Sequence, residues 1–414
     1  MTTAADQGPS SPRARRAAYL VLLAGTLIIG MGQTVVFAVL PPIARGLGLH
    51  DLQVLSIFMT SATFWVTFGP FWGRLSDDRG RRPFILLGLS AYAASMTLFA
   101  TMIELGARGL LAGGLLYALL LITRSIYGLF GSAMPPAAQA YIADRTTPDN
   151  RTSELAGFSA AFGLGAMVGP AFAGALGGVD PVAPLYGVAA LAATAVCAIA
   201  LRLNEKTAPK ERAARPTLSP FDPRIRSFLA YGLATATVTA IPTQFASFYV
   251  IDRLGFDDAS ALSAAGVVLS TAAGASLFAQ IALVQRFRLK PYILLRVGPA
   301  LLAIGHLTIA FSTELGAMAF GMMISGLGAG LVAPGYVGGA SLAVSIREQG
   351  AVAGLSNAAA SSSFIIAPPI GYLVYSTAPQ SLFIATSVLA TAAFLFAVLQ
   401  KTFGAGDASV ASPS

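Results

Sequence analysis

Charge is scarce in this sequence: Asp, Glu, Lys and Arg make up 11% of its 414 residues, against roughly 25% in an ordinary soluble domain. A soluble protein with so few charged residues could not cover its own surface. Hydrophobic residues make up 55% of the chain, and its mean hydropathy is +0.72. The composition therefore excludes an ordinary soluble domain and predicts a protein whose solvent is the lipid bilayer.

Residues that form disulfides, bind metals or catalyse hydrolysis are also few. The sequence has one cysteine and two histidines, which excludes an intrachain disulfide. We interpret Cys197, inside an apolar run, as a small core residue. The sequence contains no metal-ligand cluster, phosphate-binding glycine loop or hydrolytic triad. We therefore expect no cofactor, no bound metal and no enzymatic activity, and the chain by itself is not a primary pump.

Long apolar runs dominate what is present. They lack the alternating ten-residue pattern of a membrane β-barrel, and a backbone in lipid must satisfy its own hydrogen bonds. The sequence therefore predicts an all-α membrane protein with twelve transmembrane helices. The runs lie near residues 17–40, 52–72, 84–103, 110–140, 154–176, 185–203, 227–251, 261–284, 292–311, 315–343, 351–373 and 381–400. The fourth run exceeds one crossing, and Pro135 and Pro136 predict a bend in its second half.

The net charge of +8 comes from arginine and lysine in the short breaks between runs. Because these residues do not share one soluble face, we expect no nucleic-acid partner. Most of them precede the first run or follow the second, fourth, sixth and eighth runs, and cytoplasmic loops are the ones enriched in Lys and Arg. Both termini are therefore predicted to be cytoplasmic. No cleavable signal peptide is visible, since residues 1–16 are polar and the first apolar run is too long.

The break at 204–226 divides the runs into six and six, and its prolines and charges indicate a linker. We expect tails at 1–16 and 403–414 and two six-helix bundles at 17–203 and 227–402. The halves share short matches at equivalent places. Arg82-Pro83 opens the third run and Lys290-Pro291 the ninth, while Ala156-Gly157 and Ala353-Gly354 open the fifth and eleventh. The repeat predicts pseudo-two-fold symmetry between the bundles.

The break after the second run reads Gly73-Arg-Leu-Ser-Asp77-Asp-Arg-Gly80-Arg-Arg-Pro83. A merely basic loop would explain its arginines but neither its glycines nor Asp77. The segment resembles the signature that the major facilitator superfamily carries between its second and third helices. The resemblance implies two helical bundles with a substrate site between them near the bilayer midplane.

The same resemblance implies a gate. Gly73 would let a neighbouring helix approach, Gly80 would form a tight turn, and Asp77 would face the start of the eleventh run. The arginines would reach an aspartate at the end of the fourth run and form a latch in the outward-facing state. The gating residues implied are Gly73, Asp77, Gly80, Arg81, Arg82 and Asp144.

Arg124 is a charge inside the fourth run, where it is followed by Tyr127, Gly128 and Gly131. An arginine in a membrane helix is expensive and marks a functional site by default. The pattern is similar to a second motif of drug/proton antiporters, an arginine followed by two spaced glycines. The alternative is that Arg124 extends to the membrane surface as an anchor.

The fifth run contains Gly165-Ala-Met-Val-Gly169-Pro170. This is similar to a third motif, carried by the exporters of the superfamily and mostly absent from its importers. Its small face is expected to pack against the opposite half, with a bend at Pro170; the alternative is ordinary membrane packing. The three motifs in order resemble the twelve-helix, tetracycline-efflux-like group of drug/proton antiporters.

An acid within the membrane is missing. We assign every carboxylate to a loop or helix end, whereas many of these antiporters keep one in the first helix or the cavity for proton exchange. The first run offers Gln33 and Thr34 instead, which leaves the coupling ion open. His306 is interpreted as a packed or lipid-facing residue. The polar candidates for substrate or ion coupling are Arg124, Gln33, Tyr127, Gln244, Tyr336 and Asn357.

These observations predict a monomeric, multi-pass transporter of the bacterial inner membrane that exports small amphiphilic compounds by alternating access. Protons are the expected coupling ion. The alternative is a transporter of a defined metabolite such as an organic anion or a sugar. A receptor or scaffold without transport is disfavoured, because the gating motifs are intact.

Overall fold

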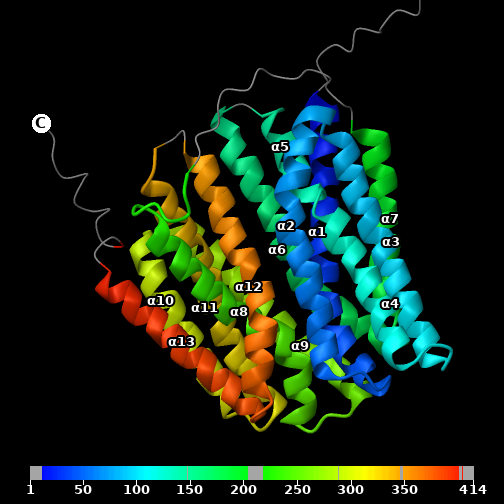
Figure 1. Cartoon of the computed structure of the whole chain (residues 1–414). Helices are drawn as coiled ribbons and strands as arrows, with labels where there is room; N and C mark the ends of the chain where they lie inside the picture. Colours follow the sequence, from blue (N-terminus) through cyan, green and yellow to red (C-terminus); the bar gives the residue numbers. More distant parts are fainter. Residues whose placement is uncertain are drawn as a thin grey trace, which may run out of the picture.

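A computed structural model describes residues 12–146, 148–203, 218–287, 289–345, 348–400 and 403. Throughout these segments the regular structure is helical (Figure 1). The predicted tails, apart from residues 12–16 and 403, fall outside the described residues, as does most of the predicted linker, including 204–217.

The first half contains seven α-helices and one π-helical segment. They are α1 (Pro12–Gly46), α2 (Asp51–Arg79), α3 (Arg82–Ala107), α4 (Gly113–Ile126), η1 (Tyr127–Gly131), α5 (Met134–Ala143), α6 (Pro148–Gly177) and α7 (Ala183–Arg202). The second half contains α8 (Arg226–Asp252), α9 (Asp258–Phe278), η2 (Ala279–Gln285), α10 (Pro291–Ala310), α11 (Leu315–Leu342), α12 (Gln349–Tyr375) and α13 (Pro379–Leu399). Every predicted run coincides with one of these helices or, for the fourth and eighth runs, with a continuous group of them.

Within the described residues, eleven helical spans are long and apolar enough to cross a membrane. The one predicted run outside this set is the seventh, 227–251, which corresponds to α8; this helix has 27 residues but is more polar. Thr235, Thr237, Thr239, Thr243 and Gln244 lie along it. These polar side chains lower its hydropathy without shortening it, so α8 completes the expected set.

The predicted bend in the fourth run is present one turn before the prolines. α4 passes into the π-helical turn Tyr127–Gly131, and α5 restarts with prolines in its first turn. Pro135 and Pro136 lack the N–H groups that would bond to Gly131 and Ser132, and their rings crowd those carbonyls. The helix therefore changes its hydrogen-bond register at the residues just before the prolines.

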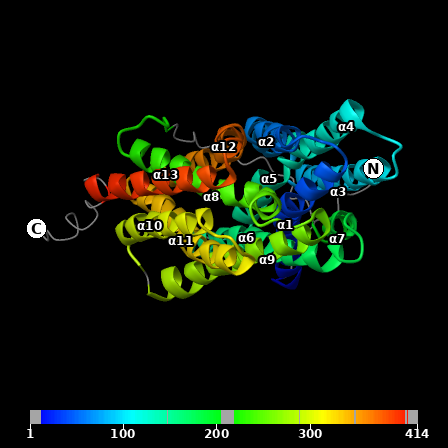
Figure 2. The same cartoon turned by 90° about the horizontal axis from the view of Figure 1, so that it is seen from below.

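The two halves lie side by side (Figures 1 and 2). In the first half, α1 packs on α6 and α7, and in the second α10 packs on α11 and α13. Between the halves, α6 meets α9, α2 meets α12, and α1 meets both α8 and α9. The interface is thus formed by α1, α2 and α6 of the first half and by α8, α9 and α12 of the second half.

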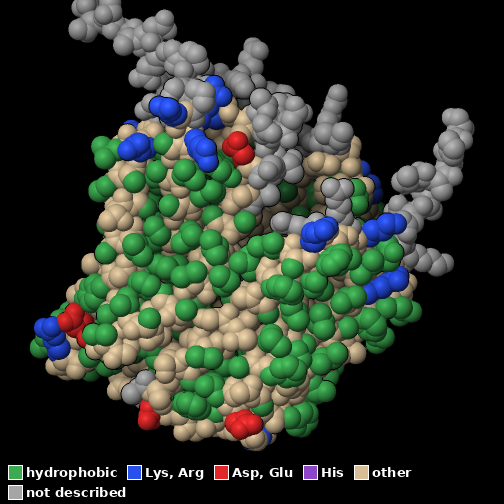
Figure 3. Space-filling view, turned by 180° about the vertical axis from the view of Figure 1, so that it is seen from behind, with side chains coloured by type: hydrophobic (Ala, Val, Ile, Leu, Met, Phe, Trp, Pro, Cys, Tyr) green, Lys and Arg blue, Asp and Glu red, His purple; other side chains and the backbone are tan. Residues whose placement is uncertain are grey.

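Charged side chains gather at two ends of the molecule (Figure 3). We call the end where α1 begins the basic end, because it carries Arg74, Arg79, Arg81, Arg82 and Arg224. We call the end where α1 finishes the acidic end, because it carries Asp51, Glu104, Asp180, Asp252 and Glu314. On the face shown in Figure 3, a broad hydrophobic surface lies between them, as a lipid-facing protein requires.

Two interpretations of single residues are settled by their positions. Cys197 on α7 is exposed, so its interpretation as a core residue is wrong. A small apolar side chain is also compatible with a position that faces lipid. His306 on α10 is fully buried, with its Nε2 3.0 Å from the Ser325 hydroxyl. It is a packed residue between helices of the second half.

Candidate functional site

Helix α6 presents small residues on two different faces. Gly165 and Gly169, four residues apart, face α1: a Cβ on Gly165 would overlap the carbonyl of Leu27, and one on Gly169 would overlap that of Met31. The Thr34 hydroxyl donates to the carbonyl of Ala166 at 3.0 Å across the same contact. The expectation that this motif packs against the opposite half is therefore wrong for Gly165 and Gly169, whose partner α1 lies in their own half.

The neighbouring face of α6 does reach the opposite half. A Cβ on Gly266 of α9 would lie 2.8 Å from the carbonyl of Pro170 and 3.6 Å from the Cα of Gly174. Gly177, one turn further, is covered by Leu262 of α9. Positions 170, 174 and 177 share a helix face rotated by about 130° from that of 165 and 169. The motif thus fixes α6 on α1 while the residues after it form the seam with α9.

At the acidic end, one arginine joins the two halves. Arg45, at the end of α1, makes a two-bond contact with Asp51 of α2 at 2.6 and 2.7 Å. It makes a second two-bond contact with Asp252 at the end of α8, at 2.6 and 2.8 Å. The Tyr375 hydroxyl of α12 donates to Asp252 at 2.7 Å, and the Arg45 guanidinium lies over the Phe248 ring at 5.1 Å. We call Arg45, Asp51, Asp252 and Tyr375 the acidic-end latch.

A layer of aromatic rings lies next to this latch. Phe37 of α1 stacks on Phe364 of α12 with ring centroids 6.1 Å apart and an interplanar angle of 4°, and it meets Phe58 of α2 edge-on at 4.8 Å. The Ser247 hydroxyl of α8 donates to the carbonyls of Phe37 and Ala38, each at 3.2 Å. Apolar stacking and backbone contacts therefore seal the interface on the acidic side of its centre.

Toward the basic end, the interface helices lose contact. A Cβ added to Gly163 of α6, Gly274 of α9 or Gly354 of α12 would meet nothing within 4 Å. Gly274, near the end of α9, and Gly354, near the start of α12, lie toward the basic end, and Gly163 lies at the middle of α6. The two halves are thus closed at the acidic end and apart at the basic end.

The loop between α2 and α3 forms a compact ionic knot. Gly80 ends α2 with a φ of 94°, a conformation that favours glycine. Arg81 pairs with Asp77 on α2 and, at 3.3 Å, with Asp144 at the end of α5. Its guanidinium also donates to the Ser76 hydroxyl at 2.9 Å. A contact between a loop arginine and Asp144 is therefore present through Arg81, inside the first half. It was expected as a latch in the outward-facing state, whereas here it occurs with the halves apart at this end.

Two other motif residues in this loop contact neighbouring helices. Arg82 donates to the carbonyl of Ala200 at 2.7 Å, near the C-terminus of α7, where a cation is favourable. A Cβ on Gly73 would lie 3.4 Å from the Cβ of Pro136, an ordinary contact distance, so α5 adjoins α2 here without requiring a glycine.

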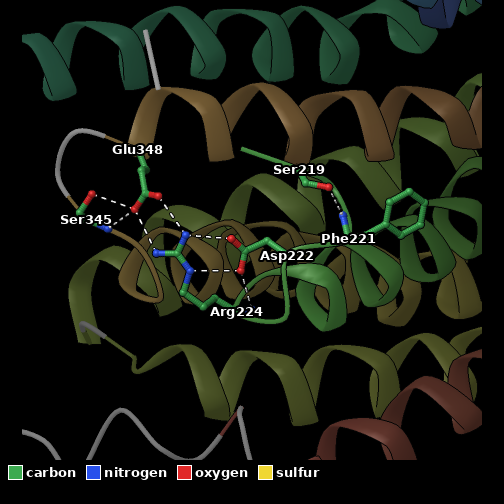
Figure 4. A network of polar contacts seen from close by, with 6 residues as sticks. All are labelled: Ser219, Phe221, Asp222, Arg224, Ser345 and Glu348. Atoms are coloured by element: carbon green, nitrogen blue, oxygen red, sulfur yellow. Dashed lines mark hydrogen bonds and ion pairs between the residues drawn. The ribbon is translucent and has the colours of Figure 1, made fainter. Parts of the chain in front are cut away.

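A second ionic network at the basic end was not predicted (Figure 4). Arg224 lies between two carboxylates. It donates to Glu348 at 2.9 and 3.1 Å and to Asp222 at 2.8 and 3.1 Å. Glu348 directly precedes α12, and its carboxylate also accepts from the Ser345 hydroxyl and backbone N–H. Arg224, more than Ser345, lowers the pKa of the Glu348 carboxyl to about 2 by hydrogen bonding to its ionised form.

Arg124 is the largest of the fully buried side chains, with 1% of its surface exposed. Its guanidinium points into the first half. It donates to the Gln33 amide oxygen at 3.2 Å and to the Met96 sulfur at 3.7 Å, and it lies 4.5 Å from the centre of the Tyr127 ring. The interpretation of Arg124 as a surface anchor is therefore wrong. The structure brings together three of the predicted site residues, Arg124, Gln33 and Tyr127.

The remaining polar candidates are separated. Gln244 is fully buried on α8 one turn before Ser247, and neither its amide nitrogen nor its oxygen has a hydrogen-bond partner among the described residues. Tyr336 is 4% exposed and its ring packs on Gly232, so it belongs to the core of the second half. Asn357 is exposed on the basic-end part of α12. Gln244 lies on α8, which packs on α1, and Asn357 lies on α12, which packs on α2.

The acidic-end latch contains the residues that sequence analysis missed. Arg45, Asp51 and Asp252 were predicted only as loop charges. Asp51 follows Arg45 closely enough to suggest a local pair, but Asp252 is 207 positions away from it. Only the packing of α1 against α8 brings them together.

Two helical bundles with an apolar exterior, joined at one end by ion pairs, define a multi-pass membrane protein. The chain belongs to the Major Facilitator Superfamily, whose family model matches residues 22–312. It is therefore a membrane transporter of that superfamily.

Several known proteins are similar to it. The tetracycline resistance protein of class G from Vibrio anguillarum is 29% identical over 84% of this chain and 88% of the relative. The class C protein from Escherichia coli is 28% identical over 88% and 91%. The structure of a bacterial homologue of the human lysosomal transporter Spinster, inward-facing and unoccupied, superimposes with a TM-score of 0.73. It shares 17% identity and covers 98% of this chain and 100% of that one.

Proposed function

We propose that this protein exports small amphiphilic compounds across the bacterial inner membrane by alternating access, as a monomer driven by the proton gradient. In this proposal the basic end and both termini face the cytoplasm, as the excess of arginine there favours. Residues 17–203 and 227–402 move as two bundles, with 204–226 as the linker. The chain carries no enzymatic activity of its own.

The observation that carries the proposal is the asymmetry of the interface. Helices α6 and α9 meet closely at Gly174, Gly177 and Gly266, in the acidic-end halves of both helices, whereas Gly163 at the middle of α6 and Gly354 toward the basic end of α12 face open space. With the basic end in the cytoplasm, this is an inward-facing conformation. A transporter of this kind also needs an outward-facing conformation, in which the acidic-end latch opens and the basic-end loops close.

The direction of transport and the substrate class are supported by the relatives. Those similar over most of the chain are tetracycline resistance proteins, and a partial match at 30% identity is multidrug resistance protein 1 of Bacillus subtilis. The gate residues keep their predicted roles in the proposal. Asp77, Arg81 and Asp144 form the knot that α12 meets when the basic end closes, and the packing of Gly165 and Gly169 on α1 keeps α6 rigid during closure.

Inverted membrane vesicles test the proposal. A proton gradient should drive uptake of a labelled tetracycline into vesicles that contain the protein, and an uncoupler should abolish it. Cells with the gene should show raised resistance to several unrelated amphiphilic drugs. Uptake at the same rate with and without the proton gradient would refute proton coupling. Unchanged drug susceptibility of the cells, together with no uptake into the vesicles, would refute drug export.

A second function, transport of a defined organic anion, is favoured by one observation. Arg124 is a cation buried in the membrane-spanning region, and among the described residues it has no carboxylate partner. Transport of a single anion with no change in drug susceptibility would support this alternative.

A further inference from the structure

Arg124 lies near the middle of the membrane. The helical span that contains it runs Gly113–Ala143, and Arg124 is eleven residues from its start, or roughly 16 Å at 1.5 Å per residue. That is about half the thickness of the hydrocarbon core. An arginine at this depth persists only when something compensates its charge.

The guanidinium is poorly compensated. It has five N–H donors, and among the described residues these donate to a neutral amide oxygen and a thioether sulfur. Its buried Nε has no hydrogen-bond partner among the described residues. The ionisable groups beside it are the phenols of Tyr92 and Tyr127, which are neutral at physiological pH. The guanidinium therefore carries a full positive charge, and its Nε–H donor has no acceptor in the described part of the chain. Among the described residues, no carboxylate contacts it.

The Gln33 side chain separates this cation from the interface between the halves. Arg124 and Tyr127 are 1% and 5% exposed, while Gln33 is half-buried. Phe37, one turn further along α1, stacks on Phe364 of the other half, so Gln33 lies directly on the open side of that aromatic layer. A ligand entering between the halves would reach Gln33 first and Arg124 behind it.

The site also offers an apolar surface for the rest of a ligand. The Trp65 ring of α2 is 5.0 Å from the Tyr127 ring, which in turn lies under the guanidinium. Trp65 is half-buried, so one part of it is free to contact an aromatic group. A planar cation next to half-exposed aromatic rings fits an aromatic molecule that carries an acid.

We infer that Arg124 and Gln33 form a binding site for the carboxylate of an amphiphilic aromatic substrate. The carboxylate takes the place of the Gln33 amide oxygen and accepts two hydrogen bonds from the guanidinium, one of them from the free Nε. The Gln33 amide then turns and donates to the carboxylate. The inference rests on the proposed export function and gives it a substrate class: the exported compound brings the negative charge that the first helix lacks.

Two fluorescent probes of the same shape test the inference. Dansylglycine carries a carboxylate, and dansylglycinamide replaces it with a neutral amide. Both are titrated at neutral pH onto the purified full-length protein in detergent. We expect the wild-type protein to bind dansylglycine roughly 10- to 100-fold more tightly, the range for a charge-assisted contact in a site shielded from water.

Four variants locate the preference. Arg124→Gln should lose the preference for dansylglycine because the positive charge is gone, so the two probes should bind with dissociation constants in a ratio near one. Gln33→Glu should also lose it while leaving Arg124 in place, because the new carboxylate occupies the guanidinium. Arg124→Lys should keep part of it, since lysine retains the charge without the fork. Arg296→Gln, an equal charge change on α10, should match the wild type. Each variant is checked for folding by its melting temperature.

The outcomes separate this inference from the proposed function. Equal binding of the two probes, binding of neither, or a preference that survives both Arg124→Gln and Gln33→Glu would each overturn the anion site. Proton-driven uptake of dansylglycine by Arg124→Gln at the wild-type rate would also remove it while leaving export intact. Preferential binding of dansylglycine with no proton-driven uptake of either probe would sustain the site and refute export.

Discussion

Arg45 connects four helices at the acidic end. It bonds directly to Asp51 of its own half and to Asp252 of the other, and Asp252 also accepts from Tyr375. The side chains of Arg45 and Asp252 are 21% and 27% exposed, so solvent weakens their pair but does not remove it. Separation of the halves breaks only the bonds to Asp252, because Asp51 stays with Arg45. One ion pair of the latch therefore reports on opening and the other does not.

Asp252→Asn should increase opening at the acidic end. Loss of a partly shielded pair worth about 1 kcal/mol shifts a two-state equilibrium roughly fivefold. The measurement is the rate at which Ser247→Cys, buried at the contact between α1 and α8, reacts with an impermeant maleimide in a Cys197→Ser background. We expect the rate to rise by about that factor.

Asp51→Asn is the matched control for this latch. It removes the same charge but leaves Arg45 with Asp252 as its sole carboxylate partner in the latch. Labelling should stay constant or become slower. Equal acceleration by both substitutions would mean that net charge, and not the pair between the halves, controls opening.

At the scale of single helices, α6 shows that the spacing of glycines does not predict which neighbouring helix they contact. Gly165 and Gly169 fit α1, whereas positions 170, 174 and 177 fit α9. All five positions are small or proline, so the sequence does not distinguish the two faces. Which face meets which helix depends on how α6 is rotated in the bundle, and that depends on all its neighbours.

Gly169→Leu should disrupt α6, because its side chain would collide with the Met31 carbonyl and the Thr34 hydroxyl of α1. Overpacking of this kind costs about 1–3 kcal/mol even where neighbours are side chains that can move, and here one is backbone. We expect a clearly lower melting temperature and loss of efflux. Gly163→Leu on the same helix is the control, since a Cβ there meets nothing within 4 Å. A Gly169→Leu protein as stable as Gly163→Leu would contradict the close packing of α6 on α1.

The network around Arg224 ties the segment before α8 to the start of α12 (Figure 4). The pKa of the Glu348 carboxyl is lowered in the folded protein to about 2, below its ordinary value. The stabilisation is therefore complete above that ordinary value and declines as pH falls through the folded-state pKa. Between pH 5 and 8 the carboxylate remains ionised, and the network should persist.

Glu348→Gln tests this pH dependence by removing the charge and keeping the shape. The variant should melt at a lower temperature than the wild type by the same interval at every pH from 5 to 8. The interval should shrink only below about pH 4, where the unfolded glutamate becomes protonated. Melting of the purified proteins in detergent measures it. If the difference in melting temperature between the two proteins halved between pH 8 and 6, a group other than Glu348 would be the one that binds protons in this range.

At the scale of the whole molecule, the bilayer explains how much of the fold the sequence predicts. Lipid requires every spanning segment to satisfy its own backbone, so long apolar runs can be assigned as helices from composition alone. The contact of Arg81 with Asp144 was predictable because a family motif carries both partners. The pair of Arg45 with Asp252 and the burial of Arg124 against Gln33 were not, since charge and hydropathy say nothing about which helices become neighbours.

Orientation in the membrane is the last property on which the proposed mechanism depends. The basic end is predicted to be cytoplasmic because loops rich in arginine are retained there during insertion. In a Cys197→Ser background, Asp180→Cys and Asp257→Cys, both at the acidic end, should react with an impermeant thiol reagent added to intact cells. Arg212→Cys, in the predicted linker, should react only after the membrane is permeabilised. The reverse pattern would place the open end of the interface outside the cell, and the conformation with the closed acidic end would then be outward-facing.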